Sequence, residues 1–366
     1  MSDLGIFLVA TPGLEQPLAD EARDAGFADP KIVPGGVETQ GDWTEVWRAN
    51  LTLRCATRVL VRVASFRAMH LAQLDKRSRK LPWADWLDPS VPLRVEASCR
   101  KSRIYHAGAA AQRIERALRE ELGANISPDA DVVVKLRIED DLAVVSLDSS
   151  GESLHKRGHK EAVAKAPMRE TMAAAFLREC GYQGREPVLD PMCGSGTFVI
   201  EAAEIAAGLL PGRDRNFAFE RFASFDPDIW VRMKSTAVRA PKFLFSGNDR
   251  DAGAVRMSRE NAERAQVSAF CDFRQGAFAD LKPPEGPPGL VIINPPYGTR
   301  IGNKGPLFGL HAQMGEVLMS RFRGWRVGIV TSQPGLAKTT GLPFKPPGPI
   351  VAHGSLKIRL YQTDPL

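Results

Sequence analysis

The pattern of apolar and polar positions begins with a short buried strand and then changes to helical spacing. Residues 4–10 are almost wholly apolar, and Thr11-Pro12-Gly13 follows them as a turn. Leucines and alanines then recur every three to four positions until Gly26, which predicts a helix over 14–25. We expect a further strand after the turn at 33–37, a helix over 42–53 and a strand over 58–63. This β-α-β-α-β order is typical of a small ferredoxin-like α+β unit.

A second α+β unit follows in the pattern. Alternation predicts a half-buried strand at 93–97, and an alanine-rich amphipathic segment predicts a helix over 107–122. Strands at 131–138 and 142–147 flank Glu139-Asp140-Asp141, which reads as a hairpin turn. Residues 149–165 are polar and indicate a connector.

From about residue 167 strands and helices alternate, which is typical of a doubly wound parallel α/β sheet. The predicted strands are 187–190, 243–247, 290–294, 326–331 and 356–361, and the predicted helices are 168–179, 197–207, 251–265 and 307–322. In such sheets ligands bind beyond the carboxyl ends of the strands, so the motifs at strand ends are the candidates for a functional site.

Composition narrows the class of protein. The chain has 366 residues, of which 43% are apolar and 25% charged, as in ordinary globular proteins. No uncharged apolar run approaches the roughly 18–20 residues that span a bilayer, and no secretory signal pattern opens the chain. The five cysteines are scattered without a CxxC pair. We therefore predict a cytoplasmic protein with neither a membrane segment, a disulfide framework nor a metal site.

The net charge of +6 permits a polyanionic partner but does not require one. Residues 1–150 carry 20 basic and 22 acidic side chains, a net charge of −2, and the remainder carries 29 and 21, a net charge of +8. The bases are clustered at 76–80, 100–103 and 155–160. A solvated basic surface is the alternative to such a partner. The candidate contacts for the polyanion lie in these clusters, at Lys76, Arg77, Arg79, Lys80, Arg100, Lys101, Arg103, Lys156 and Arg157.

The first motif, Asp190-Pro191-Met192-Cys193-Gly194-Ser195-Gly196-Thr197, joins a strand to a helix. Its glycines let the backbone approach a ligand, and the helix N-terminus offers free N–H groups. Val199 breaks the GxGxxG dinucleotide fingerprint, and no P-loop sequence occurs. A glycine loop alone could equally be a tight turn.

The second motif, Gly247-Asn248-Asp249, closes the next predicted strand. An acidic side chain at a strand end can accept both hydroxyls of a ribose. Alternatively, Asp249 or Asp251 could be the N-cap of the helix that follows.

The third motif is Asn294-Pro295-Pro296-Tyr297-Gly298. Two prolines directly after an apolar strand end its ladder and stiffen the turn. The Asn294 amide and the backbone carbonyls offer hydrogen-bond acceptors, and Tyr297 offers a flat ring on which a base can stack. Such a set suits an exocyclic amino group on a planar ring, although a rigid turn with a packed tyrosine is the structural alternative.

Together these motifs resemble those of class I S-adenosylmethionine-dependent methyltransferases of the amino type. Sequences of the first half extend the resemblance to RNA methyltransferases with a THUMP domain, and above all to the guanine-N2 methyltransferase half of the bifunctional bacterial enzyme for large-subunit ribosomal RNA. These sequences are Pro34–Val37, Arg48–Leu51, Arg54–Leu60, Pro82-Trp83, Ser102–His106 and Ser150–Gly158. The resemblance covers nearly the whole chain.

The resemblance implies a ferredoxin-like unit at 1–65, a THUMP domain at 66–150, a linker at 151–166 and a Rossmann-like methyltransferase domain at 167–366. It implies S-adenosylmethionine as the cofactor and RNA as the partner, with Asn294, Pro295, Pro296 and Tyr297 as the catalytic residues. The implied cofactor-binding residues are Asp190, Pro191, Met192, Cys193, Gly194, Gly196, Thr197, Asp249, Arg250, Ala277 and Phe278. In one departure, Ala277 stands where the family usually has an aspartate that contacts the adenine amino group.

The reaction that we predict is transfer of a methyl group to guanine N2 in RNA, with large-subunit ribosomal RNA favoured. Three alternatives are guanine-N2 methylation of transfer RNA, adenine-N6 methylation of DNA, and a non-catalytic RNA-binding protein with a degenerate methyltransferase fold. The first-half sequences oppose the DNA alternative. The intact glycine loop and the Asn-Pro-Pro-Tyr sequence oppose the non-catalytic one.

Overall fold

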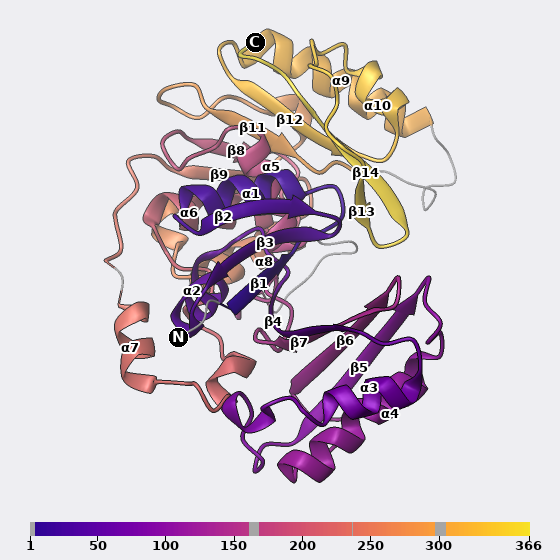
Figure 1. Ribbon diagram of the computed structural model, residues 1–366. Helices are drawn as coiled ribbons and strands as arrows, with labels where there is room; N and C mark the ends of the chain where they lie inside the picture. Colours follow the sequence, from indigo (N-terminus) through magenta and orange to yellow (C-terminus); the bar gives the residue numbers. More distant parts are fainter. Residues whose placement is uncertain (1–3, 161–167, 236, 297–304) are drawn as a thin grey trace. The chain divides into compact units, whose positions relative to one another are not determined.

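The computed structural model describes residues 4–160, 168–235, 237–296 and 305–366. The chain divides into two compact units, and each is continuous in space but not in sequence (Figure 1). The first contains the chain up to Ala10, Leu18–Leu154 and Arg215–Ser235. The second contains Thr11–Pro17, His155–Asp214 and Thr236–Leu366.

The first unit is built on one seven-stranded sheet with the order β2-β3-β1-β4-β7-β6-β5. Neighbouring strands are antiparallel except for the parallel pair β5 and β6. The strands are β1 (Leu4–Val9), β2 (Ala28–Val33), β3 (Gly36–Gly41), β4 (Arg58–Arg67), β5 (Leu93–Arg100), β6 (Val132–Glu139) and β7 (Leu142–Asp148). The helices are α1 (Glu15–Asp24), α2 (Trp43–Thr52), α3 (Leu71–Ser78) and α4 (Ala107–Ala117), followed by a π-type turn at Leu118–Leu122. The two predicted α+β units therefore share a sheet through the pairing of β4 with β7.

The N-terminal order is β-α-β-β-α-β, so our predicted order lacked a strand. The missing strand is β2, which pairs with β3 across the turn at Pro34-Gly35. It lies at the sheet edge, and its sequence Ala-Asp-Pro-Lys-Ile-Val is largely exposed. Because such an edge strand has no buried face, its sequence shows no alternation of apolar and polar residues from which the strand could be predicted.

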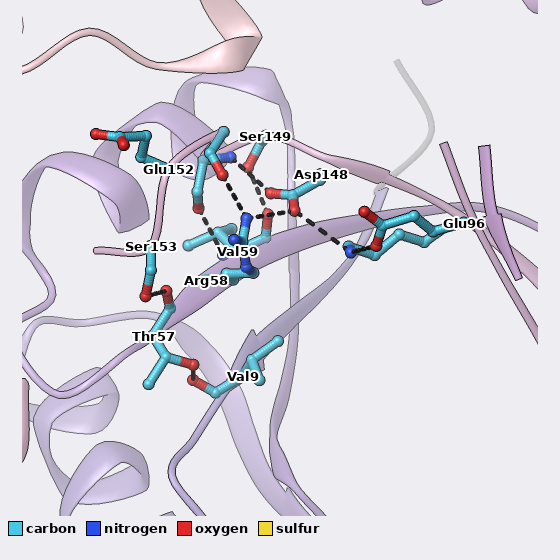
Figure 2. Close-up of polar contacts among 12 residues, drawn as sticks. Val9, Thr57, Arg58, Val59, Glu96, Asp148, Ser149, Glu152 and Ser153 are labelled. Atoms are coloured by element: carbon cyan, nitrogen blue, oxygen red, sulfur yellow. Dashed lines mark hydrogen bonds and ion pairs between the residues drawn. The ribbon is translucent and has the colours of Figure 1, made fainter. Parts of the chain in front are cut away.

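A polar network crosses the middle of this sheet (Figure 2). Arg58 of β4 donates to the buried carboxylate of Asp148 over 2.7 Å, and Nζ of Lys135 lies 2.6 Å from Glu96 and 3.8 Å from Asp148. Burial raises the pKa of Asp148, and the two nearby cations oppose that shift. Beside it, Ser149 Oγ donates to the Val59 carbonyl over 2.7 Å. Because buried polar groups need such partners, the network fixes the pairing of β4 with β7.

The segment at 215–235 belongs to the first unit although it follows 60 residues of the second in the chain. It contains α7 (Pro227–Lys234) and a short helical turn at Ala218–Arg221. The Phe219 ring stacks on Trp47 of α2 with centroids 5.9 Å apart, and Trp230 meets Phe219 edge-on at 5.0 Å. All three rings are buried, so this segment completes the core of the first unit.

The second unit is a seven-stranded sheet with the order β10-β9-β8-β11-β12-β14-β13. Its first five strands are parallel, and β14 and β13 form an antiparallel edge, so the sheet is mixed where we predicted a wholly parallel one. The strands are β8 (Val188–Asp190), β9 (Phe245–Asp249), β10 (Cys271–Gln275), β11 (Leu290–Ile293), β12 (Arg326–Thr331), β13 (Val351–His353) and β14 (Leu356–Gln362). The helices are α5 (Glu170–Glu179), α6 (Thr197–Ala207), α8 (Ala252–Arg264), α9 (Gly305–Arg321) and α10 (Pro334–Thr339), with short helical turns at Ser268–Phe270 and Phe278–Asp280.

The apolar core of this unit lies between the sheet and α9 (Figure 1). Val291 and Ile293 of β11 and Ile329 of β12 pack against Met314 and Leu318 of α9, and all five are buried. The strand ends above this core are thereby held at fixed spacing, which is what a site at the sheet edge requires. In the described part of the chain, no helix is long and apolar enough to cross a bilayer.

Candidate functional site

The glycine loop joins β8 to α6 and turns on two residues with left-handed backbones. Gly194 has φ +55° and Gly196 has φ +82°, values that side-chain-bearing residues rarely adopt. A Cβ at Gly196 would lie 3.1 Å from the Ser258 side chain, whereas a Cβ at Gly194 would meet nothing within 4 Å. The loop therefore packs closely on α8 at one glycine and leaves backbone uncovered at the other.

Hydrogen bonds hold the loop to β9 and α8. The N–H of Cys193 donates to the Asn248 carbonyl, and the N–H of Gly194 donates to Oδ2 of Asp249, each over 3.0 Å. From α8, Ser258 Oγ donates to the Gly194 carbonyl and Asn261 Nδ2 donates to the Ser195 carbonyl, again over 3.0 Å. The structure thus brings the first and second motifs together at one edge of the sheet. Sequence reasoning missed Ser258 and Asn261, which are polar residues on the buried side of α8.

Two carboxyl groups lie beside this loop, and their environments differ. Asp190 ends β8, is 2% exposed and accepts a hydrogen bond from the Met192 N–H over 3.0 Å. Burial, together with the charge of Asp249, raises the pKa of Asp190 to about 8, against the effect of that bond. Asp249 ends β9 and is half-buried. The helix N-cap proves to be Asp251, which accepts from the Gly253 N–H over 2.8 Å, so the Asp249 carboxylate is not needed for that role.

The remaining residues of the first two motifs divide between core and surface. Pro191 and Cys193 are buried, Met192 packs against the core, and Thr197 begins α6. Burial raises the pKa of the Cys193 thiol, so it stays protonated and serves packing. Arg250 is exposed, and its carbonyl accepts a hydrogen bond from Gln275 Nε2 over 3.2 Å.

The strand β10 leads to Ala277 and Phe278 next to β9. The N–H of Gly276 donates to the Asp249 carbonyl, and Asn248 Nδ2 donates to the Gly276 carbonyl, each over 3.0 Å. Ala277 is exposed beside this turn. Phe278 is 7% exposed and packs in the core with the residues of β11 and α9. Its contribution is therefore first to packing, and its predicted contact with the cofactor stays a prediction.

The third motif leaves β11, the neighbour of β8 on the side away from β9. Val291 pairs with Leu189, so Asn294 and Asp190 leave the sheet at the same edge. Asn294 is half-buried, yet its Oδ1 is inaccessible to water and accepts no hydrogen bond from any residue that the structure describes. Pro295 is buried and Pro296 exposed, whereas Tyr297 lies outside the described residues.

A buried acceptor without a donor costs free energy, typically about 1–3 kcal/mol, so the lack of a donor among the described residues calls for a reason. The geometry here supplies one, because the atom lies at the edge where parallel α/β sheets bind their ligands. Asn294 can accept a hydrogen bond from a group that enters this edge.

The connector before α5 also contributes to the loop, through a lysine that the sequence analysis did not single out. Nζ of Lys160 donates to Thr197 Oγ1 over 2.9 Å and to the Met168 carbonyl over 2.7 Å, and it lies 3.2 Å from Glu170. Lys160, Glu170 and Thr197 line a small cavity together with His159, Ser195, Ile200, Glu201 and Asn261. The basic cluster at 155–160 is thus partly an internal support of the glycine loop.

The same region corrects one predicted RNA contact. Arg157 is 3% exposed, and its guanidinium lies 3.4 Å from the carboxylate of Glu201, which is equally buried. A buried cation requires such a partner, and it cannot present itself to a phosphate. Its neighbour Lys156 is exposed.

The other predicted RNA-binding cations lie in the first unit. Lys76, Arg77 and Lys80 are exposed at the end of α3, and Arg100, Lys101 and Arg103 are exposed at and after the end of β5. Arg79 is different, because it contacts Glu120, Asp75 and Glu121, whose carboxylates raise its pKa. It ties α3 to the turn after α4 and is already engaged.

The arrangement of sheet, glycine loop and strand-end carboxylates defines a class I methyltransferase. The comparisons agree with this assignment. Residues 157–342 match the family described as the RMKL-like methyltransferase domain, and residues 5–60 match the RlmL ferredoxin-like domain. The chain therefore belongs to the RMKL-like methyltransferase family, and its cofactor is S-adenosylmethionine.

Relatives with curated names extend over most of the chain. A protein of Synechocystis sp., provisionally named an RNA methyltransferase, is 32% identical over 92% of this chain and 90% of its own length. The ribosomal RNA large subunit methyltransferase K/L of Syntrophotalea carbinolica is 36% identical over 92% of this chain and 50% of its own length. The chain thus spans about half the length of the K/L relatives that it matches.

Solved structures agree over the full length. A protein named as a methyltransferase, solved with S-adenosylhomocysteine, superposes with a TM-score of 0.90, 27% identity and coverage of 100% of this chain and 99% of the other. A Listeria monocytogenes protein, named by prediction an N6-adenine-specific DNA methylase, has a TM-score of 0.90 and 29% identity, with coverage of 100% and 97%.

The residues present suit this cofactor. Uncovered backbone at Gly194 leaves room for a ligand, and the carboxyl groups of Asp190 and Asp249 complement its positive charge. Within the described ranges, no three histidine, cysteine, aspartate or glutamate side chains lie together as metal ligands would.

Proposed function

We propose that the protein methylates the N2 amino group of a guanine in RNA, and that large-subunit ribosomal RNA is the substrate. The observation that carries this proposal is the buried Oδ1 of Asn294, which has no donor among the described residues and lies beside Pro295, at the same sheet edge as the glycine loop. An acceptor at this place selects a ligand that donates an N–H.

When bound, S-adenosylmethionine supplies a methyl group on a positively charged sulfur. The protein's task is to orient the amine, whose lone pair is delocalised into the guanine ring and is therefore a weak nucleophile. If Asn294 Oδ1 and the Pro295 carbonyl accept the two N–H bonds, the lone pair turns out of the ring plane and toward the methyl carbon. Positioning of this kind can contribute roughly 7–11 kcal/mol, and fixed dipoles stabilise the charge that develops on nitrogen.

Two further elements of the proposal concern the base. Tyr297 would stack on a guanine that has left its helix, a contact worth about 1–3 kcal/mol. No residue need act as a general base, since the methylated amine is cationic and acidic enough to release its proton to water.

The RNA substrate is supported by the names of the Synechocystis and K/L relatives and by the exposed cations of the first unit. We also keep as proposals the division of the first unit into a ferredoxin-like part at 1–65 and a THUMP domain at 66–150, and the cytoplasmic location. Adenine recognition at Ala277 would rest on backbone groups of the turn at Gly276.

The second candidate is adenine-N6 methylation of DNA, which the name of the Listeria relative favours. The two acceptors at Asn294 and Pro295 would fit that amine as well. A transfer RNA substrate would use the same chemistry as ribosomal RNA.

Incubation with labelled S-adenosylmethionine and either total RNA or DNA, followed by nucleoside analysis, separates these candidates. We expect N2-methylguanosine in large-subunit RNA. Asn294→Ala should abolish this product while the cofactor still binds. N6-methyladenine in DNA would instead establish the second candidate, and full activity of Asn294→Ala would refute the role given to this side chain.

A further inference from the structure

Tyr105 is the most exposed of the large apolar side chains that the structure describes, at 84% of its full accessible surface. It lies in the six-residue loop between β5 and α4, in the first unit. No other described ring, and no described arginine or lysine, stacks on it. A ring this exposed contributes little to packing and is accessible to a ligand.

The loop that carries Tyr105 is held in place on both sides. Before the tyrosine, the N–H of Arg103 donates to Oδ1 of Asp141 over 2.7 Å, and Ser102 Oγ accepts from the Asp141 N–H over 3.0 Å. Ile104 is 5% exposed and anchors the loop in the core. After the tyrosine, His106 Nδ1 accepts from the Ala109 N–H over 3.0 Å and caps α4.

Asp141 itself lies in the tight turn between β6 and β7, where Asp140 and Asp141 both have positive φ. Its carbonyl accepts a hydrogen bond from the Ala68 N–H over 2.9 Å, next to the end of β4. The tyrosine loop is therefore bonded to a hairpin turn that is bonded in turn to a third strand. Lys101 adopts the left-handed conformation, φ +46°, which such a fixed loop can hold despite its cost.

The surroundings of the ring are cationic. The side chains of Arg100 and Arg103 are 70% and 65% exposed, and Lys101 is exposed between them. Arg100 lies 3.7 Å from Glu139 and Arg103 lies 4.0 Å from Asp141, distances at the limit of an ion pair in water and easily given up to a phosphate. A protein-binding hot spot is normally surrounded by further apolar surface, whereas the exposed sequence neighbours here, Arg103 and His106, are charged or polar.

We propose that Tyr105 is a stacking platform for an unpaired base of a single-stranded RNA segment, with Arg100, Lys101 and Arg103 on the flanking phosphates. This inference rests on the proposed function, because it takes RNA as the substrate class. It adds that the first unit binds an exposed single strand through its bases, in addition to any electrostatic contact with the phosphates of a duplex. Fixed aromatic rings beside cations are the common solution for such strands, because every base has a π face.

The test measures binding of the full chain to a labelled single-stranded RNA of ten nucleotides and to the same sequence in a duplex. Tyr105→Ala and Tyr105→Leu should weaken single-strand binding about tenfold, and Tyr105→Phe should stay within twofold of the original. Leucine keeps apolar area but not the flat ring, so equal losses in both variants mark stacking. Binding to the duplex should change less than twofold. Leu142→Ala, a truncation of a 40% exposed side chain at the start of β7, is the matched control and should change neither affinity.

Unchanged single-strand affinity in Tyr105→Ala overturns the proposal, and so does an equal loss for duplex and single strand. A loss in Tyr105→Ala that leucine restores also overturns it, because it indicates an apolar contact. Methylation of RNA by the unaltered chain is measured in parallel. Its absence would refute the proposed function and this inference together, whereas methylation that Tyr105→Ala leaves unchanged in KM and in single-strand affinity refutes this inference alone.

Discussion

Asn261 Nδ2 donates a hydrogen bond to the Ser195 carbonyl across 3.0 Å, which ties the middle of α8 to the middle of the glycine loop. Asn261 is fully buried, so the bond is made away from water. Together with the bond from Ser258 to Gly194, it fixes two of the carbonyls whose orientation sets the direction of the loop N–H groups. The shape of the glycine loop thus depends on residues 64 and 66 positions downstream.

We predict that Asn261→Leu lowers cofactor affinity about tenfold and lowers the free energy of unfolding by about 1–3 kcal/mol. The buried Ser195 carbonyl would lose its donor, and the loop would relax. Calorimetric titration with S-adenosylhomocysteine and denaturant unfolding measure the two effects. The control is Glu260→Gln, an exposed neighbour on α8, which should change neither. An unaltered dissociation constant in Asn261→Leu would show that the loop keeps its shape unaided.

A second prediction concerns pH and Asp190. Its pKa of about 8 means that the carboxyl is mostly neutral at pH 6 and mostly ionised at pH 9. A positively charged ligand favours the ionised form, so S-adenosylmethionine should bind more tightly as pH rises toward 9, by at most tenfold per pH unit. S-adenosylhomocysteine has the same amino and carboxyl groups without the sulfonium charge, and its affinity should rise less.

Asp190→Asn should remove the difference between the two ligands in this pH range. Titrations of both ligands between pH 6 and pH 9 measure it. The prediction fails if the ratio of the two dissociation constants is constant with pH in the unaltered protein.

The third prediction concerns stability and Glu179 at the end of α5. Its Oε2 is buried without a hydrogen bond from the described residues, and burial raises the pKa of Glu179 from 4.5 to about 7. The folded state therefore holds a proton that the unfolded state releases. The resulting stability is fully present below pH 4.5 and is lost as pH rises through 7.

In the unaltered protein the free energy of unfolding should decline between pH 5 and pH 8. We expect this decline to be smaller in Glu179→Gln, by on the order of 2 kcal/mol. Urea unfolding at several pH values measures the change. Glu285→Gln, at an exposed position, is the control and should leave the profile as it was. A parallel shift of the whole profile in Glu179→Gln would mean that the carboxyl is ionised throughout.

The fourth prediction separates cations that bind RNA from cations that hold the fold. Replacing both Lys101 and Arg103 by alanine should weaken RNA binding and reduce the slope of log K against log salt by about 1–2, because two phosphate contacts are lost. Arg79→Ala should leave that slope unchanged and lower the melting temperature, since Arg79 joins Asp75 to Glu120 and Glu121. Binding isotherms at several salt concentrations and thermal unfolding give both readouts. A reduced salt slope in Arg79→Ala would instead indicate that Arg79 contacts RNA.

Regular periodicity explains which elements could be predicted from the sequence. The helix at 197–207 and the strand at 326–331 have the predicted bounds, because each buries a face or the whole of its length. The exposed edge strand β2 gave no such signal. The placement of the segment at 215–235 could not be predicted for another reason. Its aromatic residues indicate burial, but no local pattern shows which part of the chain they pack against.

The site shows the same division. Glycines and acids at strand ends indicate a ligand locally, and the structure brings the Gly194 loop and Asp249 together. Lysine at 160 and arginine at 157 lie in one basic run, and only the fold shows that both face buried carboxylates. Charge along the sequence does not distinguish a surface cation from the inner half of an ion pair.

The path of the chain between the two units has a consequence for synthesis. Trp47 emerges early from the ribosome, but its ring partners Phe219 and Phe225 emerge some 170 residues later. The first unit therefore cannot close its core until the segment His155–Asp214 of the second unit has been synthesised, in contrast to domains that fold one after another from the N-terminus. A truncated chain ending near residue 154 would expose those aromatic positions, so the first unit is not a module that can be cut out or exchanged as one contiguous piece.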